Sequence, residues 1–388
     1  FARHVNAGKV AMYRQLDLDA VMGAREGSTF ADAWSEASFI NCHCNGGVFN
    51  LGHRHPRIVA SLRTALDSLD IGNHHLVSGW RAKLAERLAE TTGNLLPGVV
   101  FGVGGGEAID LAIKVARAGT SRQNIVSADG GYHGHTGLAM AAGDAEFRDP
   151  FGPNPPGFVQ VPFDDLVALE ASVDDSCAAV LLEPIPATLG MPIADPGYFE
   201  GVQAICQNRG AKLILDEIQT GLGRTGKMWA YQHHGLEPDV VVTGKGLSGG
   251  LYPIAATFMT RELHAFFDSH PHIHVSTFGG AELGCAVALE VLDIVEERGF
   301  LSRVNELSDR FREGFEGLPF DLRRRGLMMG LAFAEEGAGM MAAAVLYKAG
   351  IFAVWANNDP KVLQFLPPLV LSDAEADELI ARIRTVFE

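Results

Sequence analysis

Short apolar runs alternate with helical segments between about residues 98 and 260, and this alternation constrains the fold more than any other feature. The apolar runs are of strand length and rich in β-branched and aliphatic residues. They lie at 99–101, 124–126, 158–161, 178–182, 213–215, 240–242 and 254–257. Segments with helical periodicity, such as 107–118 and 199–208, separate them. Strands that alternate with helices predict an α/β fold with a mostly parallel central sheet flanked by helices.

The rest of the chain predicts a second, smaller unit. With 388 residues the chain exceeds the usual size of one domain. Residues 285–298 and 303–316 have helical periodicity, 327–333 is an apolar run, and 373–386 forms a final helical pattern. The first forty-odd residues have no strong period, so they can join this unit or cross to a partner chain. We predict a large domain at 49–284 and a small α+β domain that is built from the two flanking segments, 1–48 and 285–388.

Composition and charge narrow the function classes. The net charge of −16 disfavours a surface for nucleic acid or anionic membranes, which needs clustered Lys and Arg. Charges or prolines interrupt every apolar run before it reaches membrane-spanning length. The five cysteines are odd in number and scattered, which favours the reducing cytoplasm over a disulfide framework. The chain starts at Phe1 without a signal-peptide pattern or an initiator Met, so its natural N-terminus stays open.

Two polar residues follow neighbouring buried strands. Lys245 comes directly after the apolar run 240–242, and Asp216 ends the run 212–215. Because the carboxyl ends of parallel strands meet at one edge of a sheet, the amine and the carboxylate could meet there. Pyridoxal phosphate (PLP) chemistry requires this pair: a lysine forms the Schiff base, and an aspartate pairs with the pyridinium nitrogen. The sequence therefore predicts a PLP enzyme.

Two further elements suit the same cofactor. Phe101-Gly102-Val103-Gly104-Gly105-Gly106 turns from a strand into a helix, and such a turn presents backbone N–H groups to a phosphate. A tight turn that only needs glycine is the alternative interpretation. Tyr132 and His133 follow the run 124–126, where an aromatic face could stack on a flat ring. All of these residues are predicted at strand ends of one sheet.

Other motifs support competing interpretations. Gly221-Leu222-Gly223-Arg224-Thr225-Gly226-Lys227-Met228 nearly spells a nucleotide P-loop, but Met228 lacks the hydroxyl that magnesium needs, and a Gly-rich surface loop is the better interpretation. Cys42-His43-Cys44 with His53 and His55 matches no common zinc spacing, so core packing is favoured. His270, His272 and His274 alternate on a predicted solvated turn. We expect no metal site.

The chain resembles the class III aminotransferases, a fold-type I PLP-dependent family, along nearly its whole length. Seven motifs carry the resemblance: Asn50-Leu51-Gly52-His53-Arg54-His55-Pro56, Gly105-Gly106-Glu107-Ala108 with Lys114-Val115-Ala116-Arg117, Tyr132-His133-Gly134-His135, Leu182-Glu183-Pro184, the segment from Asp216 to Gly226, Thr243-Gly244-Lys245-Gly246, and Ser276-Thr277-Phe278-Gly279-Gly280. The Asp216 and Lys245 segments are highly specific in combination.

The resemblance implies a role for each residue around the cofactor ring. Lys245 would form the Schiff base and then shuttle the α-proton, and Asp216 would keep the pyridine nitrogen protonated. Gln219 would hydrogen-bond the phenolic oxygen of the ring. Tyr132 would lie on one face of the ring with His133 beside it.

The resemblance also implies the rest of the cofactor site. Ile218 would pack against the other face of the ring. Gly105 and Gly106 would offer backbone N–H groups to the phosphate, and Thr277 would add a hydroxyl from a neighbouring subunit. This last role implies a homodimer with shared active sites. Glu183 matches a carboxylate that pairs with a substrate-binding arginine or contacts the cofactor pocket.

Departures from the family pattern concern the phosphate and the substrate. Gly104 stands where the family usually has Ser, so the phosphate would depend more on backbone N–H groups. Gln364 stands where members that handle α-amino acids often carry an arginine, so a bidentate carboxylate clamp would be missing. Asn45-Gly46-Gly47 replaces a commoner Gly-x-Gly, and Ala281-Glu282 replaces Asn-Pro.

We therefore expect an aminotransferase that moves an amino group by ping-pong chemistry between an amine or amino acid donor and a keto acid or aldehyde acceptor. We favour a donor amine that is remote from any α-carboxylate, such as an ω-amine, or a specialised metabolite amine. Four arginines could still bind a carboxylate: Arg81, Arg148, Arg224 and Arg323. An aminomutase or an epimerase of the same family is the alternative, and a non-catalytic binding module or P-loop nucleotide binder is a remote one.

Overall fold

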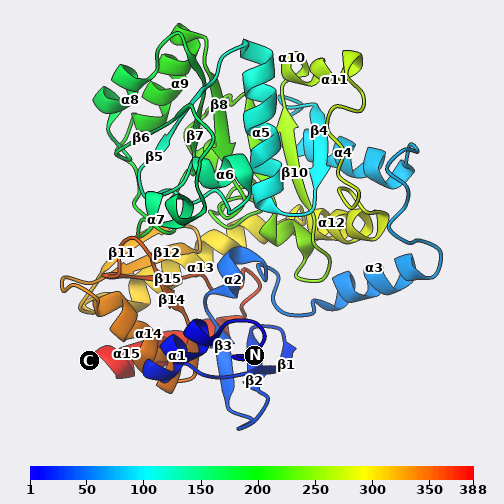
Figure 1. Cartoon of the computed structure of the whole chain (residues 1–388). Helices are drawn as coiled ribbons and strands as arrows, with labels where there is room; N and C mark the ends of the chain where they lie inside the picture. Colours follow the sequence, from blue (N-terminus) through cyan, green and yellow to red (C-terminus); the bar gives the residue numbers. More distant parts are fainter.

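A seven-stranded sheet forms the centre of the larger of two lobes (Figure 1). The computed structural model describes all residues from 1 to 388. The strand order is β4 (Gly98–Gly102), β10 (Ala255–Met259), β9 (Val240–Thr243), β8 (Lys212–Asp216), β7 (Cys177–Leu182), β5 (Asn124–Ala128) and β6 (Phe158–Val161). Only β10 runs antiparallel to its neighbours. The expected strands and the mostly parallel sheet are confirmed.

Both faces of this sheet are covered by helices, because alternate residues of each strand enter two different cores. Ile214 packs with the inner side of α5 (Gly105–Thr120), whereas Leu213 and Leu215 pack with α12 (Glu282–Val295) and its surroundings. α12 lies on α3 (Pro56–Leu66) and α4 (Gly79–Thr91). Burial on both sides explains why the strands are almost continuously apolar in the sequence.

The remaining helices of the large lobe lie in its connections. They are α2 (Cys44–Gly47), α6 (Gly137–Ala141), α7 (Ala145–Arg148), α8 (Leu166–Ser172), α9 (Tyr198–Arg209), α10 (Arg261–His264) and α11 (Phe266–Ser269), with 3-10 turns at Asp149–Phe151, Ala230–His233 and Lys245–Ser248. α8 and α9 pack together at one end of the sheet. None of the helices in the structure has the length and apolarity needed to cross a bilayer.

The smaller lobe contains two four-stranded sheets. One joins β1 (Met22–Glu26), β2 (Thr29–Asp32) and β3 (Ser38–Asn41) to β13 (Ile351–Phe352), and the other has the order β11 (Asp321–Arg325), β12 (Met328–Ala332), β15 (Val362–Phe365), β14 (Val354–Trp355). α13 (Phe300–Gly314), α14 (Ala338–Lys348) and α15 (Asp373–Phe387) complete it. Because β13 pairs with β3, the N-terminal strands belong with the C-terminal segment.

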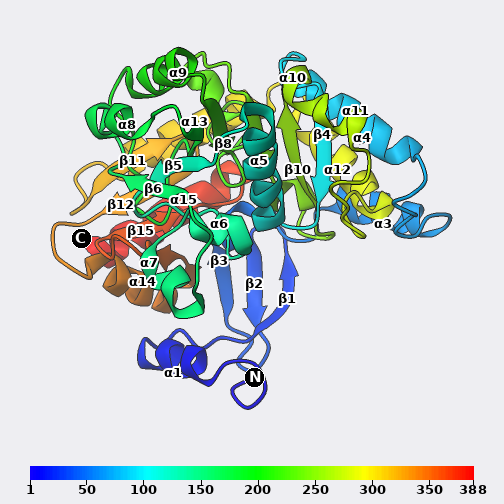
Figure 2. The same ribbon diagram turned by 45° about the horizontal axis from the view of Figure 1, so that its top comes forward.

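Helix α1 (Ala7–Gln15) has no buried residue. It stands away from the body of the chain (Figure 2).

The division into domains stays a proposal, and the packing suggests moving one of its boundaries. We expected the C-terminal domain to start at residue 285, but the buried residues of α12 belong to the core of the large sheet. The second core starts with Val304 of α13 and includes Ile40 and Cys42 from the N-terminal segment. A division by hydrophobic cores therefore falls between α12 and α13, because α12 buries its apolar surface against the large lobe.

Candidate active site

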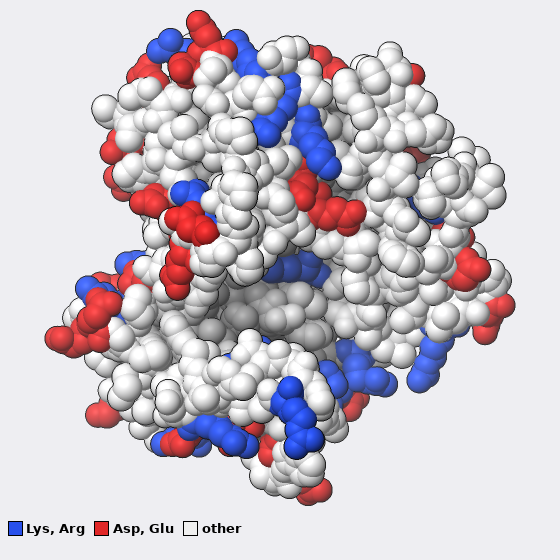
Figure 3. All heavy atoms as spheres, in the orientation of Figure 1, with Lys and Arg blue, Asp and Glu red and all other residues white.

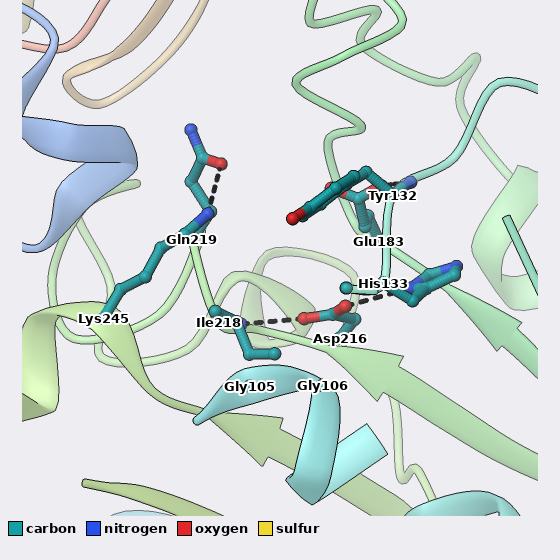
Figure 4. Close-up of a pocket in the computed structure, with 10 residues that line it drawn as sticks. Gly105, Gly106, Tyr132, His133, Glu183, Asp216, Ile218, Gln219 and Lys245 are labelled. Carbon is teal, nitrogen blue, oxygen red and sulfur yellow. Dashed lines mark hydrogen bonds and ion pairs between the residues drawn. The ribbon is translucent and has the colours of Figure 1, made fainter. Parts of the chain in front are cut away.

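Nine of the ten predicted cofactor residues line one cavity of about 150 Å³ at the carboxyl edge of the large sheet (Figure 4). They are Gly105, Gly106, Tyr132, His133, Glu183, Asp216, Ile218, Gln219 and Lys245. They lie at or after the ends of β4, β5, β7, β8 and β9, so sheet topology brings together residues that are up to 140 positions apart in the chain (245 − 105). The tenth, Thr277, is exposed and does not line the cavity.

Asp216 is held in place by two hydrogen bonds. It ends β8, and the alternation of side chains puts it on the same face as Ile214, which α5 covers. His133 Nδ1 lies 2.9 Å from Asp216 Oδ2, and the Ile218 N–H donates to Oδ1 at 3.0 Å (Figure 4). Burial lowers the pKa of His133, but the hydrogen bond and charge of Asp216 outweigh it, and the net pKa is raised. The imidazole therefore acts as the hydrogen-bond donor of this pair.

Lys245 has an unusual backbone and a buried amine. Its φ is 38°, a left-handed conformation that costs a non-glycine residue energy and is often found at functional positions. Its Nζ donates to Gln219 Oε1 at 2.8 Å. Burial lowers the pKa of Lys245, although the charges of Asp216 and Glu183 oppose this shift. A lowered pKa increases the share of the neutral, nucleophilic amine at neutral pH.

Glu183 supports the loop on the opposite side of the cavity. It follows β7, and its Oε1 accepts a hydrogen bond of 2.9 Å from the Tyr132 N–H. Burial raises the pKa of Glu183, His133 lowers it and Asp216 raises it further. The carboxylate thereby connects the Tyr132 loop to the strand that carries Glu183.

The start of α5 offers open space and free donors for an anion. Gly104 precedes the helix without a side-chain cap, and the Glu107 carboxylate accepts a hydrogen bond from the Val103 N–H. A Cβ on Gly105 would lie 2.7 Å from Ile218 Cδ1, and one on Gly106 would lie 2.7 Å from Thr136 Oγ1. Both positions need glycine because Ile218 and Thr136 already occupy the space next to them. Free N–H groups at a helix start suit a phosphate.

Two buried polar atoms at the cavity lack a hydrogen-bond partner. They are Gln219 Nε2 and His133 Nε2. A buried polar atom without a hydrogen bond destabilises the folded state unless a ligand or a water molecule bonds to it. Gln219 Nε2 can donate to an oxygen of a bound ring, so this orphan donor, the Asp216 carboxylate and the open helix start fit pyridoxal phosphate.

Helix α2 contributes to the site in a way that sequence reasoning missed. The backbone of Gly46 lies so close to Lys245 that a Cβ on Gly46 would be 3.2 Å from the lysine Nζ. His43, at the start of this turn, has its pKa lowered to about 4 by burial and by the charge of Lys245. The signal in the sequence was the Asn45-Gly46-Gly47 run, because adjacent glycines permit the positive φ that Gly46 and Gly47 both adopt.

Two rival interpretations have a clear structural outcome. The P-loop-like segment is buried from Gly221 to Gly226, so the expectation of a surface loop was wrong. Its Arg224 donates hydrogen bonds to the carbonyls of Leu327 and Pro367 and to Asn50 Oδ1. These bonds join the large lobe to the small one. No group of His, Cys, Asp or Glu side chains is arranged to hold a metal ion.

Comparison with known proteins agrees with this arrangement. The sequence profile of the family "Aminotransferase class-III" matches residues 20–387. The chain belongs to the class III aminotransferases. An uncharacterized aminotransferase of Archaeoglobus fulgidus is 50% identical over 395 residues, which cover 100% of this chain and 93% of the relative. The predicted family and the aminotransferase activity are confirmed.

Solved structures show the same architecture. The ornithine aminotransferase of Toxoplasma gondii is 28% identical and superposes with a TM-score of 0.89, covering 98% of this chain and 94% of that one. The N-acetylornithine aminotransferase of Stenotrophomonas maltophilia is 27% identical with a TM-score of 0.82, covering 97% and 98%. The fold-type I class is therefore confirmed. Members of this family depend on PLP, and this aminotransferase uses the same cofactor.

Proposed function

We propose that Lys245 and Asp216 are the catalytic residues of this aminotransferase. The observation that carries the proposal is their position in one cavity, where Lys245 faces Gln219 and Asp216 is fixed by His133. When bound, PLP supplies a conjugated ring that stabilises negative charge at the substrate carbon next to the amine. The protein must then hold the ring, keep its nitrogen protonated and move one proton.

Each of these tasks has a residue suited to it. The Asp216 carboxylate would hold a proton at the ring nitrogen, since the hydrogen bonds that it accepts from His133 and the Ile218 N–H leave lone pairs free. The Lys245 amine, with its lowered pKa, would attack as a nucleophile and carry the substrate proton. Gln219 Nε2 would donate to the ring oxygen, and Glu183 would fix the Tyr132 loop.

The remaining contacts would hold the cofactor without taking part in proton transfer. Tyr132 and Ile218 both line the cavity, where Tyr132 would stack on one face of the ring and Ile218 would pack against the other. The N–H groups at Gly105 and Gly106 would bind the phosphate.

We propose a donor whose amine is remote from any α-carboxylate. No arginine lines the cavity, and Gln364 uses its Nε2 on the Trp355 carbonyl at 3.4 Å. The candidate arginines are engaged elsewhere: Arg81, Arg148 and Arg224 donate to backbone carbonyls, and Arg323 donates to the Gly190 carbonyl and to Asp359. The hollow between the lobes is lined mostly by side chains that are neither acidic nor basic (Figure 3). A clamp for a carboxylate would need a free guanidinium there.

We further propose that the chain acts as a homodimer. Exposed apolar side chains gather on the α3–α4 connection and on the loop before α12; they are Leu76, Val77, Ile273, Val275 and Phe278, which we call the apolar face. These two segments lie together, since the rings of His75 and His272 are 6.1 Å apart. Thr277 lies within this face, so a second copy docked on it would bring Thr277 towards the first copy's phosphate site.

The cytoplasm remains our proposal for the compartment. All five cysteines are buried and unpaired, which suits a reducing environment.

The deciding experiment is a half-reaction followed by the visible absorbance of the bound cofactor. The purified holoenzyme is mixed with ω-amines, simple primary amines, ornithine, N-acetylornithine and α-amino acids, without any acceptor. Conversion to the amine form of the cofactor by amines that lack an α-carboxylate supports the proposal. Conversion only by α-amino acids that lack a second, remote amine refutes the proposed donor class. An isomer of the amine that forms while the cofactor returns to its aldehyde form without any acceptor favours an aminomutase or an epimerase.

A further inference from the structure

One peptide next to the cofactor site is held by side chains from three separate segments. Gly130 lies between the end of β5 and Tyr132. Its N–H donates to Asp144 Oδ1 at 2.8 Å, and its carbonyl accepts from Thr188 Oγ1 at 2.9 Å and from Asn358 Nδ2 at 3.0 Å. Asn358 Nδ2 also donates to Asp144 Oδ2 at 2.6 Å. The backbone N–H and the carbonyl of Gly130 are therefore both used in hydrogen bonds.

The three segments belong to different parts of the molecule. Asp144 directly precedes α7, and Thr188 follows Glu183 in the loop after β7. Asn358 comes from the small lobe, where it lies in the loop between β14 and β15. Its own N–H donates to the Thr188 carbonyl at 2.9 Å. A single residue of the small lobe thus connects two loops that border the cofactor cavity.

The local backbone makes this contact demanding. Gly130 has a φ of 77°, and a Cβ there would lie 2.6 Å from Leu189 Cδ1. The peptide therefore passes close to the loop after Glu183, and its orientation depends on the groups that bind it. A second connection runs beside it, since Arg323 donates to the Gly190 carbonyl at 2.7 Å and lies 3.4 Å from Asp359 Oδ2.

We propose that Asn358 is a positioning residue through which the small lobe sets the loop that carries Tyr132 and His133. Tyr132 follows Gly130 by two residues, and His133 orients Asp216. A displaced Gly130 backbone would therefore shift both the Tyr132 ring and the hydrogen bond that holds the Asp216 carboxylate. The inference rests on the proposed cofactor roles of Tyr132 and His133. It adds that the small lobe, and not the large lobe alone, decides their geometry.

The pairing of Asn358 with Asp144 allows a reciprocal exchange as a test. Asn358→Asp places two carboxylates against each other where an amide now donates, and like charges at this distance repel. Adding Asp144→Asn removes the charge repulsion and lets the new amide donate to the carboxylate at position 358, but that carboxylate still cannot donate to the Gly130 carbonyl. Asn358→Ala removes the donors without adding charge. Asn357→Ala, at the neighbouring exposed position, serves as the matched control.

Two readouts separate positioning from general stability. In the apoenzyme, hydrogen exchange of residues 129–134 is compared with exchange in β8, and in the holoenzyme the dissociation rate of PLP is followed by absorbance. We expect Asn358→Asp to speed exchange in 129–134 and to speed PLP dissociation by about tenfold, since one or two hydrogen bonds are lost. The double variant should reverse only the part due to charge repulsion and so resemble Asn358→Ala, and Asn357→Ala should show neither effect.

Several results would overturn the proposal. Exchange and PLP dissociation that stay unchanged in both Asn358→Asp and Asn358→Ala would do so, as would a general increase of exchange in β8 that the double variant fails to reverse. Tyr132→Ala distinguishes failure of the underlying function. If this variant holds PLP as tightly as the unaltered protein, the cofactor role of Tyr132 is wrong, whatever the Asn358 variants show.

Discussion

Lys245 differs from an ordinary surface lysine in its surroundings and in its backbone. Its amine is surrounded by Gln219, the Gly46 backbone and the cavity, and its φ is positive. We expect Lys245→Ala to slow the half-reaction by about 10²–10⁴-fold or more, because a nucleophile and a proton carrier are both lost. Stopped-flow absorbance with excess amine donor measures this rate.

Lys227 provides the control for this prediction. It is exposed, and its Nζ donates only to the Gln232 carbonyl. Lys227→Ala should leave the half-reaction unchanged, whereas a P-loop enzyme would depend on Lys227. Full activity of Lys245→Ala would refute the assigned mechanism.

Glu217, the neighbour of Asp216, makes stability depend on pH. It is fully buried, and burial raises its pKa to about 7, although Thr220 and the N–H groups of Tyr231 and Ala230 act in the opposite direction. A pKa raised by folding means that the native state binds the proton more tightly than the unfolded chain. The contribution to stability is therefore complete below about pH 4.5 and is lost as pH rises towards 7.

We expect Glu217→Gln to flatten this part of the pH profile, because the amide keeps the shape and cannot ionise. The change corresponds to about 2–3 kcal/mol between pH 5 and pH 8 for a shift of this size. Urea unfolding of the apoenzyme at several pH values measures it. Glu86→Gln, at an exposed position on α4, should keep the original slope, and a Glu217→Gln profile that matches this control would contradict the prediction.

At the scale of elements, the start of α5 is the clearest case of a local sequence that prepares a binding site. Gly104 and Gly105 are neighbours, yet a Cβ on Gly104 would meet nothing within 4 Å, whereas one on Gly105 would lie 2.7 Å from Ile218 Cδ1. We expect Gly105→Ala to weaken PLP binding by about tenfold, since overpacking costs about 1–3 kcal/mol and displaces Ile218 or the helix start.

Equilibrium titration of the apoenzymes with PLP tests this prediction. Gly104→Ala is the matched control, because Gly104 has an extended backbone and free space, and its PLP affinity should stay within about twofold of the unaltered protein. Equal affinities of the two variants would show that the approach of Gly105 to Ile218 does not shape the site.

The strands of the large sheet and five of the long helices (α5, α9, α12, α13 and α15) could be predicted to within a few residues, whereas α3, α4 and α14 were not predicted. β7, β8 and β9 are buried on both faces, so their apolar runs end where the sheet ends, and the polar residues there mark its edge. α2 and the strands of the small lobe other than β12, which matches the apolar run 327–333, were not predicted. α2 is four residues long with positive φ inside, and β13 and β14 have two residues each, so neither leaves a measurable period.

At the scale of the whole molecule, the apolar face predicts the oligomeric state. Val77 is fully exposed in the single chain and adjoins Leu76, which is also exposed. We expect Val77→Glu to convert a dimer into a monomer, because a charge without a partner cannot be buried at an interface without a large cost. Sedimentation velocity measures the mass, and PLP affinity should fall with the loss of Thr277 of the second copy.

Val167 provides the control for the dimer prediction. It lies on α8 and is 81% exposed, but it is far in sequence from the apolar face. Val167→Glu should leave the mass and the PLP affinity unchanged. A monomeric unaltered protein with full PLP affinity would refute both the dimer and the shared phosphate site.

The sequence alone determined the α/β class, the PLP chemistry and nine of the residues that line the cavity. Lys245, Asp216, the glycine turn and Tyr132 follow from local patterns at the ends of apolar runs, whereas the roles of Glu183, Ile218 and Gln219 came from the family resemblance. Only the tertiary structure decided that Gly46 lies over Lys245, that Arg224 is buried between the lobes and that Asn358 reaches Gly130. Contacts of this kind join segments up to 228 residues apart in the chain. A local hydrophobic period does not indicate which distant segment will pack against it.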